Sequence, residues 1–133
     1  MTTRQRRLTP LTLVSGGRAS AREAAIAAAL LPDQATAVIL EGLADGNSIL
    51  ADLAEHTFPS PSFPLQLVHI APGCLCCSGN LVLRVTLNRL LRQAPARLFV
   101  SLADASHIEQ LRNWLTASPY DAWLALEQDL LVS

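Results

Sequence analysis

The chain of 133 residues contains no lysine, because all ten of its basic residues are arginine. A standard phosphate-binding loop places a lysine ammonium beside the nucleotide phosphates, so this motif is excluded in its usual form. Only 16% of the residues are charged and the net charge is -1. This balance gives no electrostatic reason to expect nucleic acid or an anionic membrane as a partner. Long apolar runs are also missing, and none approaches the ~20 residues that span a bilayer.

Cysteine is scarce but concentrated, since all three cysteines lie in Gly73-Cys74-Leu75-Cys76-Cys77. Three cysteines cannot all pair, and neighbours such as Cys76 and Cys77 rarely form a disulfide without strain. Reduced thiols are therefore expected, which favours a cytoplasmic protein. Thiolates this close can hold one soft metal ion from a single turn. The alternative is that three small side chains simply fill a tight turn, because free cysteine packs well.

Half of the residues are hydrophobic, which predicts a folded chain with one core and a single domain over residues 1–133. Short apolar runs alternate with helical patterns along this domain. The expected strands are 11–14, 35–40, 65–70, 98–100 and 122–126, and the expected helices are 21–31, 48–56, 80–93 and 107–116.

This alternation predicts an α/β fold with a mostly parallel sheet of about five strands and helices on both faces. In such sheets the functional loops follow the carboxyl ends of the strands. The cysteines follow the third strand, and Glu41 closes the second strand. The two groups are expected to be neighbours if the second and third strands lie side by side.

The order of the strands, with Gly-Cys-Leu-Cys-Cys after the third, resembles the CobW-like metallochaperone GTPases. The resemblance covers residues 8–130, and the cysteine motif is its specific part. It implies a P-loop-GTPase-like three-layer α/β/α fold and a metal site formed by Cys74, Cys76 and Cys77. A glutamate-containing loop lies by the metal in that family, so Glu41 is the first candidate for a further ligand and Asp45 is a distant second. The competing interpretation of Glu41 is an ordinary loop acid. His69 could also be a ligand, but a histidine inside a strand is more often a packed or edge residue.

The family's Gly-x-x-x-x-Gly-Lys-[Ser/Thr] pattern falls on the segment from Gly16 to Glu23, with several departures. Ala21 replaces the second glycine, Arg22 the lysine and Glu23 the hydroxyl residue. The planar fork of arginine does not reproduce a point-charge ammonium, and a carboxylate repels phosphate. Gly16, Gly17 and Arg22 are therefore interpreted as a vestigial phosphate-binding loop.

Other departures from the family pattern also argue against nucleotide binding. Ser101 and Asp104 stand where the family has an acid and a glycine, and the chain ends before any guanine-reading Asn-Lys-x-Asp loop. We also expect the family's C-terminal domain to be absent. Arg18 and Arg22 lie one helical turn apart, as either a small anion patch or solvated arginines on an exposed face.

The leading hypothesis is a non-enzymatic, metal-binding protein derived from a metallochaperone GTPase domain. Zinc(II) is the first candidate metal, with cobalt(II) and copper(I) next, and GTP is not expected to bind. The candidate partners are an intact CobW-like GTPase, a metal-dependent client protein or a second copy of the chain, without nucleic acid or membrane. Two alternatives remain open: an atypical GTPase in which Arg22 serves the phosphates, and a structural adaptor in which the cysteines only pack.

Overall fold

The computed structural model describes residues 8–30, 34–42, 65–70, 81–93, 95–103, 106, 108–117 and 120–132. The expected helix over 48–56 and the cysteines lie outside these residues. The elements are β1 (Thr9–Ser15), α1 (Ala19–Ala29), β2 (Thr36–Glu41), β3 (Leu65–Ile70), α3 (Leu81–Arg92), β4 (Arg97–Ser101), α4 (Ile108–Leu115), the 3-10 helix η2 (Tyr120–Ala122), β5 (Leu124–Leu126) and β6 (Leu130–Leu131).

The strands form one sheet in the order β3-β2-β4-β1-β5, and β6 also pairs with β1. Every strand pair in the described part of the chain is parallel. Parallel strands are joined by crossover connections, and the intervening helices cover the sheet. The α/β fold with a mostly parallel sheet is therefore confirmed.

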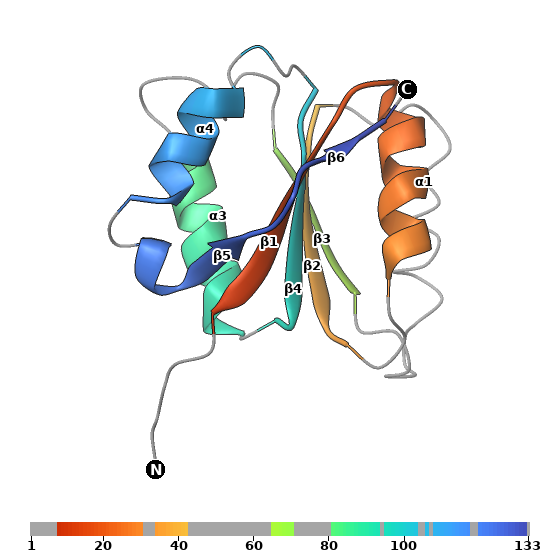
Figure 1. The fold of residues 1–133 in the computed structure, drawn as a ribbon. Helices are drawn as coiled ribbons and strands as arrows, with labels where there is room; N and C mark the ends of the chain where they lie inside the picture. The colour runs from red at the N-terminus through yellow and green to blue at the C-terminus, as the bar shows by residue number, and fades with distance from the viewer. Residues whose placement is uncertain are drawn as a thin grey trace.

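The helices cover both faces of the sheet, with α1 on one face and α3 and α4 on the other (Figure 1). Successive side chains of a strand point to opposite faces, so each strand serves both cores. In β2, Ala37 and Ile39 belong to the core cluster that includes α3 and α4. Val38 and Leu40 belong to the second cluster, together with Ile26 of α1. The result is a three-layer α/β/α arrangement.

The two longer helices differ in what they bury. In α3, Leu83, Leu87 and Leu90 are at most 1% exposed, at the three- and four-residue spacing of an amphipathic helix. The buried residues of α1 are Arg22, Glu23 and Ile26. Two charged residues on the buried side of a helix require specific partners, because burying an unpaired charge costs much free energy.

The C-terminal residues follow β1 as an interrupted strand. Ala122, expected at the start of the fifth strand, lies instead in η2, and β5 begins at Leu124. After a break, β6 pairs with the end of β1, and no strand was expected there. Asp129 lies in the break and accepts two hydrogen bonds from Arg112 of α4, at 2.8 and 2.7 Å. This ion pair fixes the connection between β5 and β6 against the helix layer.

The two tryptophans, Trp114 and Trp123, have packing roles. The ring centroids of Trp114 and Tyr120 lie 4.9 Å apart, and those of Tyr120 and Trp123 lie 5.6 Å apart. Both tryptophans are partly buried against the core cluster below α3 and α4. In the part of the chain that the structure describes, no helix is long and apolar enough to cross a membrane.

Candidate functional site

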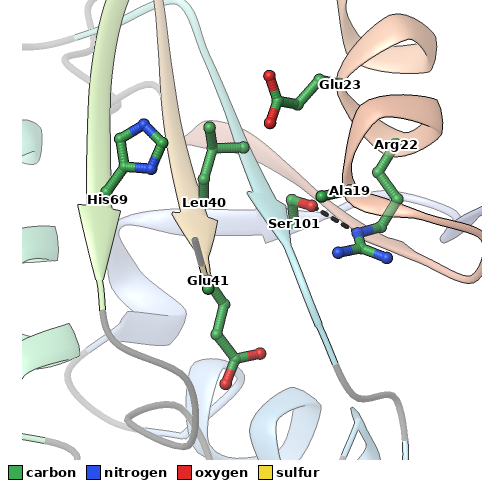
Figure 2. A pocket seen from close by; sticks show the side chains of 8 residues that line it. Ala19, Arg22, Glu23, Leu40, Glu41, His69 and Ser101 are labelled. Atoms are coloured by element: carbon green, nitrogen blue, oxygen red, sulfur yellow. Dashed lines mark hydrogen bonds between the residues drawn. The ribbon is translucent and has the colours of Figure 1, made fainter. Parts of the chain in front are cut away.

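A hollow lies at the carboxyl edge of the sheet, where β2, β3 and β4 end beside the first turns of α1 (Figure 2). This is the edge at which parallel sheets place their functional loops. The residues that line the hollow are Ala19, Arg22, Glu23, Leu40, Glu41, Gly42, His69 and Ser101.

Arg22 is 4% exposed and lies inside the hollow. Its Nε donates a hydrogen bond to Ser101 Oγ at 2.8 Å. Its Nη1 donates to the carbonyl oxygens of Gly16 and Gly17, at 3.1 and 2.9 Å. The solvated-arginine interpretation is therefore wrong for Arg22, although Arg18, the N-cap residue of α1, is exposed.

Only Gly16, Gly17 and Arg18 connect β1 to α1, because the helix already begins at Ala19. The φ angles of the two glycines are 90° and 61°, in the left-handed region that favours glycine. A Cβ on Gly16 would lie 2.3 Å from the carbonyl oxygen of Val132, just after β6. The three turn residues are exposed to solvent, but the Val132 carbonyl oxygen packs closely against Gly16 and leaves no room for a side chain there.

Glu41 ends β2 on the opposite face of the sheet from Ser101, and its side chain points away from Arg22 (Figure 2). The side chain is buried, and Oε1 accepts a hydrogen bond from the backbone N–H of Ala103 at 2.9 Å. This bond joins the end of β2 to the residues that follow β4. Glu41 therefore has a local structural role whatever else it binds.

The ends of β2 and β3 lie side by side, as the sequence interpretation required. Glu41 is in register with Ile70, and the N–H of Gly42 donates to the carbonyl oxygen of Ile70 at 2.9 Å. The segment that contains Cys74, Cys76 and Cys77 starts directly after Ile70, but these cysteines lie outside the described residues. Within the described ranges, no group of three or more histidine, cysteine or acidic side chains is arranged to hold a metal. The cysteine site stays a prediction.

His69 is exposed and lies on β3, the edge strand of the sheet, so the edge-residue interpretation is confirmed. It is in register with Leu40 and shares the face of α1, where it lines the hollow together with the buried Glu23. Since Glu41 is the next position of the register, His69 and Glu41 project to opposite faces. A ligand at the strand ends would therefore meet them from different sides.

The sequence interpretation missed the role of Ser101. It marked Ser101 only as a replacement for an acid, whereas the hydroxyl is 2% exposed and accepts the Arg22 hydrogen bond. A serine directly after the apolar run Leu98–Val100 was the available signal. Its partner was not deducible, because 79 positions separate the two residues.

Comparison with curated proteins finds similarity to the zinc chaperone YeiR of Escherichia coli (strain K12), with 39% identity over 67 residues. The matched part is 50% of this chain and 20% of that protein, so the chain aligns with about a fifth of its relative. That relative is a CobW-family member, which supports the CobW-like resemblance. No family model and no solved structure matches the chain.

Proposed function

We propose that this chain handles a transition metal, with zinc(II) as the first candidate, and that it does so without hydrolysing GTP. In this proposal Cys74, Cys76 and Cys77 are the thiolate ligands and Glu41 is the further ligand. The observation that carries the proposal is the register of β2 and β3, which puts Glu41 beside the residue that precedes the cysteine segment. The similarity to a zinc chaperone supports the choice of metal.

The proposed donor set suits zinc. Three thiolates and one carboxylate supply the four ligands of a tetrahedral site, and thiolate donors favour zinc or copper(I) over hard cations. Cys74 is four residues beyond Ile70, so the extended chain reaches at most ~14 Å from the strand end. Glu41 lies within that distance, because neighbouring strands are only about 4.8 Å apart. The covalent chain therefore permits these ligands to meet.

The absence of GTP hydrolysis is supported by the hydrogen bonds of Arg22. Three of its N–H groups are used by Ser101, Gly16 and Gly17. These bonds fix the guanidinium against the turn, so an atypical GTPase would have to break them or reach the phosphates through Nη2 alone. It would also bring phosphate close to the buried Glu23, which lines the same hollow.

As a metal-handling domain, the chain would act in the cytoplasm, either handing its metal to a client protein or pairing with an intact CobW-like GTPase. A second copy of the chain is the remaining candidate partner. In the competing structural-adaptor hypothesis the cysteines only pack, and neither metal nor chelator changes stability. Metal binding itself therefore decides between these functions.

The test is a cobalt(II) titration of the reduced, metal-free protein, followed by displacement with zinc(II). Thiolate coordination gives sulfur-to-cobalt charge-transfer absorption, and we expect saturation at one metal per chain. The double substitution Cys76→Ser and Cys77→Ser should weaken binding by about 100-fold or more, because thiolates supply most of the binding free energy. Full affinity in the double variant would remove the cysteine site. Glu127→Gln is the control, because Glu127 is exposed and remote from the hollow.

A further inference from the structure

The β1–α1 turn has the opposite polarity from a phosphate-binding loop. Phosphate loops direct backbone N–H groups at their ligand. Here the carbonyl oxygens of Gly16 and Gly17 both accept hydrogen bonds from Nη1 of Arg22. Ser101 Oγ accepts the third hydrogen bond, from Nε. Three oxygen acceptors from β4 and the turn thus converge on one cation.

We infer that these three oxygens form a guanidinium site, which the chain fills with its own Arg22. We call Gly16 O, Gly17 O and Ser101 Oγ the guanidinium cradle. A guanidinium is planar, permanently charged and carries its donors in a fixed fork, so acceptors on two of its edges are satisfied together. An ammonium has no such fork, and a phosphate placed here would meet oxygen atoms instead of donors.

The burial of Arg22 and Ser101 makes this complementarity necessary, although Gly16 and Gly17 themselves are exposed. Arg22 and Ser101 are 4% and 2% exposed, so the charge is held almost entirely away from water. A buried charge is tolerated only when its hydrogen-bonding groups are satisfied and opposite charge is near. Glu23 is also buried and lines the same hollow, so a carboxylate lies on the same stretch of α1 as the guanidinium.

Gly16 is explained by an internal contact as well. Its φ of 90° and the 2.3 Å approach of a Cβ to the Val132 carbonyl oxygen exclude a larger side chain. The N–H of Val132 also donates to the Ser15 carbonyl oxygen at 2.8 Å. The glycine and the arginine that resemble a phosphate loop thus both make contacts within the chain, Gly16 with Val132 and Arg22 with the turn carbonyls. In this arrangement the turn needs no nucleotide to fix it.

The test uses Arg22→Ala in the presence of a metal chelator, so that its result is independent of the metal-handling proposal. We expect the variant to lose on the order of 10 °C in Tm, because the cradle oxygens lose their buried partner. Millimolar methylguanidinium should restore part of this loss with saturation. Methylammonium at the same concentration should not, and neither should inorganic phosphate or GTP with magnesium. The wild-type protein should respond to none of these compounds.

The inference is overturned if phosphate or GTP stabilises either protein, or if methylguanidinium does no more than methylammonium. A second measurement covers the case in which Arg22→Ala does not fold. Arg22→Lys keeps the charge and loses the fork, and Ser101→Ala removes one oxygen of the cradle. The two substitutions should be non-additive in a double-mutant cycle of thermal unfolding. Additive effects would show that Arg22 and Ser101 are not coupled and would contradict the cradle.

Discussion

Two places along the carboxyl edge of the sheet differ in how their polar groups are used. At the β1–α1 turn, the Arg22 guanidinium is held inside the molecule by oxygens of the turn and of β4. At the ends of β2 and β3, Glu41 holds the Ala103 N–H, and the nearby His69 is exposed to solvent. The first place is filled by the chain itself, whereas the second adjoins the segment that carries all three thiols. The two places therefore invite different expectations, a self-contained turn at the first and the proposed metal site at the second.

The physical reason for the difference lies in the chemistry of each place. A phosphate site depends on backbone donors and a mobile cation, and a single buried arginine can satisfy the acceptors that replace them. A metal site depends on a few deprotonated side-chain donors, and in the proposed function the cysteines after β3 would supply these independently of the β1–α1 turn. Substitutions at each place should therefore have separate effects.

The largest effect on stability is expected from Gly16→Ala. The added Cβ would meet the Val132 carbonyl oxygen, and the φ of 90° is strained for alanine, so we expect a loss of about 3 kcal/mol. Gly17→Ala is the matched control, because its φ of 61° lies in the ordinary left-handed region and costs about 1–2 kcal/mol. Urea unfolding measures both. Equal losses would show that the Val132 carbonyl oxygen does not restrict position 16.

A smaller effect, on zinc affinity at the ends of β2 and β3, is expected from Glu41→Gln. An amide is a poor zinc ligand compared with a carboxylate, so zinc affinity should fall by about tenfold, which is about 1.4 kcal/mol. The metal-free protein should lose only ~1 kcal/mol, since the amide oxygen still accepts the Ala103 N–H. Unchanged zinc affinity would remove Glu41 from the ligand set while leaving its structural bond in place. Glu127→Gln should alter neither quantity.

The smallest effect on stability is expected at Asp129, between β5 and β6, which belongs neither to the β1–α1 turn nor to the ends of β2 and β3. The hydrogen bonds from Arg112 lower the pKa of Asp129 below its ordinary value of 3.8, and burial opposes them. The folded state therefore binds fewer protons, so the stabilisation is complete above that value and is lost as the pH falls through the lower folded pKa. Asp129→Asn should lose about 0.5–1 kcal/mol at neutral pH and show a flatter acid limb. Its zinc affinity should match that of the wild-type protein, and a change would link β6 to the metal site.

Much of the fold was predictable from local patterns. The strand Leu65–Ile70 was predicted with its observed bounds, and the leucine spacing of α3 identified its buried face. The break between β5 and β6 was not predictable, because it depends on the Arg112–Asp129 pair across 17 positions. The short strand β6 follows from pairing with β1, which local propensity does not encode.

The candidate site was predictable only in part. The sequence places Glu41 near the cysteine segment only if β2 and β3 are neighbours, and the observed register confirms that they are. The burial of Arg22 was missed, because the pattern of an alanine-rich helix does not say which charged side chain turns inward. The bond of Glu41 to Ala103 joins residues 62 positions apart and likewise depends on the tertiary fold. The cysteine ligands stay a prediction.

The most direct test of the contrast between the two places is thermal unfolding of the reduced, metal-free protein with zinc(II) and, separately, with GTP and magnesium. A ligand at 100 times its Kd adds about 2.7 kcal/mol of stability to the folded state that binds it. We predict that zinc raises the Tm by on the order of 10 °C, that the Cys76→Ser and Cys77→Ser variant abolishes this rise, and that GTP has no effect. A rise with GTP and none with zinc would contradict both the guanidinium cradle and the metal site.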